Sequence, residues 1–114
     1  MSKVTESLPL AFLALAPADQ QSDAGYNAMQ VNYEPLTKTV DPEDVLGSMF
    51  SCTLISFDEK ERISGIQDEK GKKRACQKML DILLKSWKRG YYEKFIQVLK
   101  DCNYEECAAQ LQSN

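Results

Sequence analysis

The fold is decided by residues 75–102, which read ACQKMLDILLKSWKRGYYEKFIQVLKDC. In the first half, apolar residues recur at positions i, i+3, i+4, i+7, i+8 and i+11, a spacing that lines one face of an α-helix. They are Cys76, Met79, Leu80, Leu83, Leu84 and Trp87. Gly90 ends this helix, and the second half repeats the design. Its apolar residues are Tyr92, Phe95, Ile96, Leu99 and Cys102. The stretch therefore predicts two consecutive amphipathic helices.

An earlier apolar stripe predicts a bent or two-part first helix over residues 29–52. Its members lie at i, i+4, i+7 and i+11, and they are Met29, Tyr33, Leu36 and Val40. Pro35 lies inside the stripe, so the helix is kinked there or begins there with Pro35 in its first turn. Asp41 suits a helix N-cap and Pro42 suits the first helical position, which predicts where the second part begins.

Two shorter helices complete the pattern. Residues 56–59 form a capping box, and the short helix that follows turns Ile63 and Ile66 inward before a turn at residues 68–73. The last short helix carries the apolar residues Tyr104, Cys107, Ala108 and Leu111. Short helices joined by short loops bury such stripes by packing together. The sequence therefore predicts an all-α fold, a compact antiparallel bundle of five or six helices.

The bundle is expected to occupy residues 29–114 as a single domain. Residues 1–28 are expected to form a flexible N-terminal segment, because residues 17–28 are polar and contain both Gly and Pro.

Charge is divided along the chain. Residues 1–69 carry twelve acidic and four basic residues, a net charge of −8, whereas residues 70–100 carry ten basic and two acidic residues, a net charge of +8. Residues 101–114 add three acidic residues, and the whole chain has a net charge of −3. A domain that folds these segments together has faces of opposite sign. Such faces allow head-to-tail association, although the solvated outer faces of charged helices would give the same pattern.

Most kinds of catalytic site lack the residues that they need. The chain has no histidine, which excludes Ser-His-Asp and Cys-His couples and histidine metal ligands. The glycines and lysines of residues 65–73 depart from a phosphate-binding loop in their spacing, and Lys73 stands where that loop needs Ser or Thr. No catalytic, cofactor-binding or metal-binding residue is predicted.

Two other classes of protein stay open at this point. The cysteines form no Cys-x-x-Cys pair, and a cytosolic protein with reduced thiols is the simplest interpretation. However, Leu8–Ala16 resembles a minimal signal peptide, which would make the chain a small secreted helical protein with two disulfides that begins near Pro17. The basic residues between 70 and 78 could instead belong to a small RNA-binding module. No membrane span is expected, because a span needs about 20 apolar residues. DNA binding is not expected either.

Three stretches together resemble a caspase-recruitment domain (CARD) of the death-fold superfamily, and they are most similar to the CARDs of the RIG-I-like cytosolic RNA receptors. They are MQVNYEPLTKTVDPEDVLGSMF (29–50), ISFDEKERISGIQDEKG (55–71) and ACQKMLDILLKSWKRGYYEKFIQVLKDCNYEECAAQL (75–111). The resemblance implies a six-helix antiparallel bundle with Greek-key topology and no enzymatic activity. It also implies CARD–CARD contacts between charged patches, and helical signalling filaments in antiviral, inflammatory or apoptotic pathways.

The resemblance also implies that the partner-binding residues form two charged patches. The acidic patch, at the start of the second helix, would be Asp58, Glu59 and Glu61. The basic patch would begin just before the third helix with Lys72, Lys73 and Arg74. It would continue around the start of the fourth helix with Lys88, Arg89 and Lys94.

The partners implied are other CARD-containing proteins, whether receptor, adaptor or caspase, together with further copies of the chain in an oligomer or filament. The expected location is cytoplasmic. The chain is then an adaptor, a CARD-only decoy that caps other CARDs, or an N-terminal piece of a larger receptor. The family's sixth helix is expected to be missing or very short, because the sequence stops at Asn114.

Overall fold

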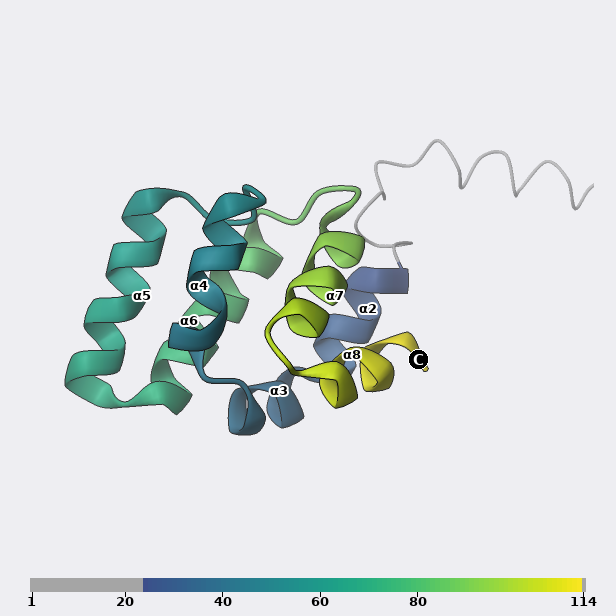
Figure 1. Ribbon diagram of the computed structural model, residues 1–114, viewed down its shortest axis with the longest axis horizontal. Helices are drawn as coiled ribbons and strands as arrows, with labels where there is room; N and C mark the ends of the chain where they lie inside the picture. The colour runs from purple at the N-terminus through teal and green to yellow at the C-terminus, as the bar shows by residue number, and fades with distance from the viewer. Residues whose placement is uncertain (1–23, 114) are drawn as a thin grey trace, which may run out of the picture.

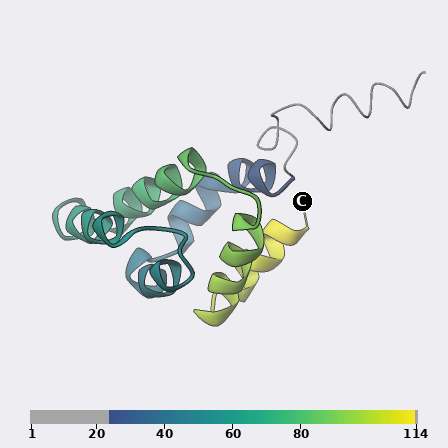
Figure 2. The same ribbon diagram turned by 90° about the horizontal axis from the view of Figure 1, so that it is seen from above.

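The computed structural model describes residues 24–113, which form seven α-helices and no β-strand (Figure 1). The helices are α2 (Ala24–Val31), α3 (Tyr33–Thr39), α4 (Pro42–Ser51), α5 (Phe57–Lys70), α6 (Lys72–Lys85), α7 (Tyr91–Asp101) and α8 (Glu105–Gln112). Helices α4, α5 and α6 alternate in direction at one end of the bundle, and α2, α7 and α8 form the other end (Figures 1 and 2). The predicted all-α bundle is confirmed. The signal-like stretch at residues 8–16 lies outside the described residues.

The first two helices form one bent unit. The side-chain amide of Asn32 donates to the carbonyl of Ala28 at 2.8 Å. The backbone N–H of Leu36 donates to the carbonyl of Asn32 at 3.0 Å, so helical hydrogen bonding continues through the bend. Pro35 lies in the first turn of α3, where its missing N–H costs little. The predicted bend is therefore present, and it lies at Asn32, just before Pro35.

The bent or two-part first helix predicted over residues 29–52 is wrong in its extent, because that range holds the end of the bent α2–α3 unit and then α4 as a separate helix. Val40 and Asp41 have extended backbones, and the Asp41 carboxylate caps α4 by accepting from the N–H of Glu43 at 3.0 Å. With α2 and α3 counted as one bent helix, residues 24–113 contain six helices. The sixth helix, expected to be missing or very short, is present as α8.

Helix α2 begins at Ala24, inside the segment that was expected to be flexible up to residue 28. The cause is a close contact with α7, since a Cβ on Gly25 would lie 2.5 Å from the Cβ of Tyr92. Only glycine lets the two helices approach so closely. A glycine contact adds nothing to an apolar stripe, so the periodicity in the sequence begins only at Met29.

Helix α5 is longer than predicted, and one residue joins it to α6. It continues to Lys70, through most of the turn that was predicted at residues 68–73. Gly71 has a φ of 94°, a backbone conformation that favours glycine, and its N–H donates to the carbonyl of Gln67 at 3.0 Å. Its own carbonyl accepts from the N–H of Ala75 at 3.1 Å. The chain therefore reverses direction within a single residue, and α5 and α6 pack along each other.

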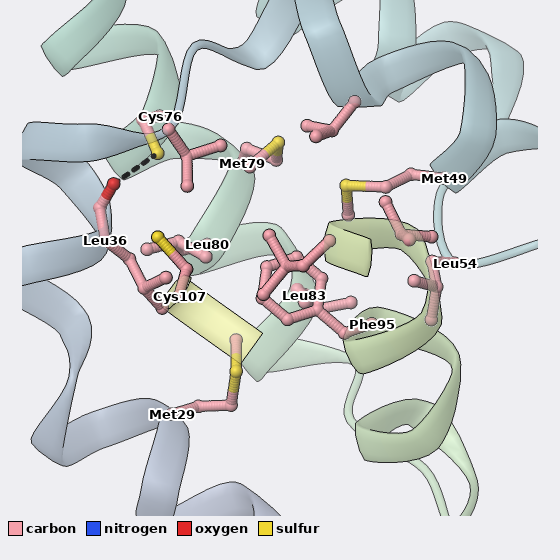
Figure 3. Packing of buried hydrophobic residues seen from close by; sticks show 14 of the residues in the cluster. Met29, Leu36, Met49, Leu54, Cys76, Met79, Leu80, Leu83, Phe95 and Cys107 are labelled. Atoms are coloured by element: carbon pink, nitrogen blue, oxygen red, sulfur yellow. Dashed lines mark hydrogen bonds between the residues drawn. The ribbon is translucent and has the colours of Figure 1, made fainter. Parts of the chain in front are cut away.

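The apolar stripes predicted for α6 and α7 form the centre of the core. All their members are buried except Leu84, Tyr92 and Cys102, which are half-buried. Figure 3 shows Leu83 of α6 and Phe95 of α7 together, with Met49 of α4 beside them. Burial of these side chains is the main favourable contribution to folding.

Trp87 covers the end of this core next to α2. It is 4% exposed, and its ring meets those of Tyr26 and Tyr91 edge to face, with centroids 5.8 Å apart in both pairs. Such ring pairs stabilise a fold beyond the area that they bury.

The four cysteines are all free thiols, namely Cys52, Cys76, Cys102 and Cys107. Cys76 and Cys107 are buried in the core (Figure 3), and Cys52 and Cys102 are half-buried. Burial raises the pKa of the Cys76 thiol to about 12, and that thiol donates to the carbonyl of Leu36 at 3.6 Å. The pKa of Cys107 is also raised, chiefly by burial.

We expect Trp87→Ala to lower the free energy of unfolding by about 3–5 kcal/mol, because it removes a large buried ring and leaves a cavity. Urea unfolding followed by circular dichroism measures this change. Val31→Ala is the matched control, since Val31 is 68% exposed and its loss should change the free energy of unfolding by less than about 0.5 kcal/mol. A Trp87→Ala variant with wild-type stability would contradict the core described above.

Iodoacetamide at pH 8 should modify Cys52 and Cys102 in the native protein, and Cys76 only after unfolding. The reason is that the thiolate is the reactive form, and burial both hides Cys76 and keeps it protonated. Peptide mass spectrometry without prior reduction reads the modified positions. A secreted protein with two disulfides would instead yield no modified cysteine, even after unfolding.

Candidate partner-binding surfaces

The acidic surface lies at the start of α5, where the local sequence requires negative charge. The Ser56 hydroxyl accepts from the N–H of Glu59 at 3.1 Å, and the Glu59 carboxylate accepts from the N–H of Ser56 at 2.9 Å. This capping box uses the Glu59 carboxylate for the fold. Asp58 and Glu61 are exposed, and Glu61 lies 3.9 Å from the Lys60 ammonium, a weak ion pair. Of the predicted acidic patch, Asp58 and Glu61 thus remain for a partner.

The first part of the predicted basic patch forms the first turn of α6, not a loop before it. Its three members, Lys72, Lys73 and Arg74, are all exposed. Positive charge at a helix N-terminus opposes the helix dipole, and Gly71 supplies no side-chain cap to offset it. Four other basic residues of the bundle occupy the last turn of a helix, where positive charge is stabilising. These are Lys38, Lys70, Lys85 and Lys100. The three charges therefore do nothing for the helix that carries them.

The structure does not bring the six predicted basic residues together. Lys88 and Arg89 are exposed in the loop between α6 and α7, at the far end of a 14-residue helix that is about 20 Å long. Lys94, in the first turn of α7, donates to the Thr53 hydroxyl at 3.1 Å. In Figure 1 the loop from α6 to α7 and the start of α7 lie at the upper edge of the bundle, as does the start of α5, whereas α6 begins at the lower edge.

A groove between α5 and α6, which we call the α5–α6 groove, extends the basic surface. It has a volume of about 420 Å³ and is lined by Ile66, Lys70, Arg74, Gln77, Lys78 and Asp81. Two of its basic residues, Lys70 and Lys78, are absent from the predicted patch. For Lys78 the sequence does hold a signal, because its spacing of four residues from Arg74 places both on one face of a helix. Lys70 lies on the preceding helix and has no such signal. Asp81 is engaged elsewhere, because it accepts from the Tyr33 hydroxyl at 2.7 Å.

The acidic residues at the start of α4 hold the bundle together. The Tyr104 hydroxyl donates to Asp44 at 2.6 Å and accepts from the N–H of Asp41 at 3.1 Å. The side-chain amide of Gln67 donates to the Asp41 carboxylate at 2.9 Å, which lowers the pKa of that carboxyl. Burial and the hydrogen bond to Asp44 raise the pKa of Tyr104 to about 12. Asp41, Asp44 and the Tyr104 hydroxyl have these partners within the fold, so we do not assign them to a partner surface.

Between residues 24 and 113, no three Cys, Asp or Glu side chains lie so that they could hold a metal ion. None of the helices in that range combines the length and the apolar character that a membrane crossing requires.

A protein-family model described as "Caspase recruitment domain" matches residues 22–114. No curated protein and no solved structure matches the sequence. The family consists of non-enzymatic protein-interaction domains that bind other CARD and death-fold proteins in apoptotic and inflammatory signalling. The compact helical bundle agrees with the death fold of that family. On its sequence and its fold, the chain belongs to the caspase recruitment domain family.

Proposed function

We propose that this chain is a cytoplasmic signalling module that binds other CARDs through oppositely charged surfaces. The acidic surface is the start of α5, with Asp58 and Glu61, and the basic surface is the start of α6, with Lys72, Lys73 and Arg74. The observation that supports the proposal most is the position of the three basic side chains. They are exposed in a helix first turn, where their charge opposes the helix dipole, so a role outside the fold explains them.

The arrangement of the two surfaces supports head-to-tail association. They lie at opposite ends of the α5–α6 pair, so they cannot neutralise each other within one copy (Figure 1). A contact between two different surfaces leaves one surface free on each terminal copy, and repetition of the contact builds an open chain. Complementary charge accelerates the encounter and excludes partners of like charge.

The second basic group belongs to a separate contact in this proposal. The α6–α7 loop and the start of α7, which carry Lys88, Arg89 and Lys94, lie at the same end of the bundle as the start of α5 (Figure 1), and Lys94 donates to the Thr53 hydroxyl just before α5. They could therefore meet an acidic partner beside the first contact.

The likeness to the CARDs of RIG-I-like receptors supports a role in antiviral or inflammatory signalling. An adaptor must use both charged surfaces, because it binds one CARD through each of them, whereas a decoy needs only the surface that occupies another CARD.

A protein partner fits these surfaces better than single-stranded RNA does. The aromatic rings of Trp87 and Phe95, which would have to stack on bases, are buried.

Combined reversal of the basic turn, by Lys72→Glu, Lys73→Glu and Arg74→Glu, should abolish association and leave the helical circular dichroism unchanged. We expect this because the three side chains are exposed, and the attraction of Lys72 for the Asp41 carboxylate only adds to hydrogen bonds that already hold that carboxylate. Sedimentation velocity of the purified chain and its binding to purified CARDs provide the readout. Wild-type association should also weaken as salt rises, since exposed charges are screened.

The matched control reverses three other exposed lysines, by Lys38→Glu, Lys85→Glu and Lys100→Glu, which gives the same change of net charge. This control should still associate. Wild-type association by the basic-turn variant would overturn the charged-surface mechanism. Equal loss in both variants would show that net charge alone governs association.

A further inference from the structure

Two phenylalanines are exposed side by side where α4 ends and α5 begins. Phe50 is 42% exposed and Phe57 is 55% exposed, and their ring centroids lie 5.9 Å apart at an interplanar angle of 68°. The Lys60 ammonium lies 5.8 Å from the Phe57 ring. The fold does not explain the Phe57 ring, because Ser56 and Glu59 already cap α5. Exposed aromatic rings in contact are typical of a protein-binding surface.

Two acidic residues lie close to Phe57 in the sequence, in addition to the Lys60 ammonium near its ring. Asp58 follows Phe57 directly, and Glu61 lies four residues after it, on the same face of α5. Both are exposed. An aromatic centre with a charged rim is the usual composition of an interface hot spot. A matching surface must therefore offer an apolar depression with basic groups at its edge.

The α5–α6 groove offers one apolar side chain with basic side chains around it. The half-buried side chain of Ile66 lies between the two helices, and the basic side chains Lys70, Arg74 and Lys78 line the same groove. Its volume of about 420 Å³ is within the range of protein ligand pockets, about 300–1,000 Å³. The groove thus offers Ile66 as an apolar contact for a phenylalanine ring, and positive charge for the acidic residues near that ring.

The two surfaces cannot meet within one molecule. Phe57 and Ile66 are nine residues apart on the same helix, which is two and a half turns and about 13 Å. They therefore lie on opposite sides of α5. The groove of one copy can receive only the phenylalanine pair of another.

We propose that Phe57 of one copy, supported by Phe50, inserts over Ile66 in the α5–α6 groove of a second copy. Asp58 and Glu61 then pair with Arg74 and Lys78 across the contact. This inference rests on the proposed function and gives its charged contact an apolar centre. Lys72 and Lys73, which do not line the groove, contribute long-range attraction, whereas Arg74 contacts the inserted segment.

Two variants that each block one side of the contact test this inference. Phe57→Asp removes the inserted ring, and the double variant Arg74→Glu with Lys78→Glu removes the basic rim. Each should raise the dissociation constant of self-association at least about 30-fold, as loss of a hot-spot side chain does. Val31→Asp is the control, because Val31 is exposed on α2, away from both surfaces, and should not alter association. Thermal unfolding checks that every variant is folded.

Mixing the two blocked variants gives the decisive result. The Phe57→Asp chain keeps its groove and the rim variant keeps its phenylalanines, so sedimentation velocity should show a 1:1 dimer that does not grow further. A mixture that stays monomeric would overturn the inference, and so would a wild-type chain that never self-associates. If Phe57→Asp assembles normally while the Lys72, Lys73 and Arg74 reversal still abolishes association, the inference fails and the proposed function stands. If neither change affects association, both fail.

Discussion

The burial of α6 is the constraint on which the rest of the structure depends. One side of this helix is fully inside the bundle, with Ala75, Cys76, Met79, Leu80 and Leu83. Helices α3, α4 and α5 all contact it, so its apolar stripe sets where they pack. A helix covered in this way can carry charge only on its remaining side. The same packing that forms the core therefore orients Arg74 and Lys78 toward the groove shared with α5.

Sequence patterns predict the parts of this fold that follow from local periodicity. The stripes of α6, α7 and α8 are visible because burial of one helix face imposes a period of 3.6 residues. The start of α2 is not visible, because it depends on Gly25 fitting against Tyr92, far away in the sequence. Asp41 could be predicted as a cap. Whether it divides a bent helix or separates two helices depends on Tyr104 and Gln67, which hold it from other helices.

The candidate surfaces show the same division between local and tertiary information. Individual exposed charges can be predicted, but their grouping requires the arrangement of the helices. The capping box that predicts the start of α5 also engages the carboxylate of Glu59. The same motif that indicates the acidic patch therefore makes Glu59 less available to a partner. The α5–α6 groove has no single sequence signal, because Lys70 and Arg74 lie on different helices and meet only through the turn at Gly71.

The one-residue link at Gly71 also bears on the order of folding. Contacts between α5 and α6 join residues that are near in sequence, and closing so short a loop costs little chain entropy. Folding rates rise as contacts become more local, so this hairpin belongs among the early structures of the chain. Both the groove and the aromatic start of α5 lie within or beside it. Both surfaces of the proposed contact therefore belong to a part of the chain that is synthesised before α7 and α8.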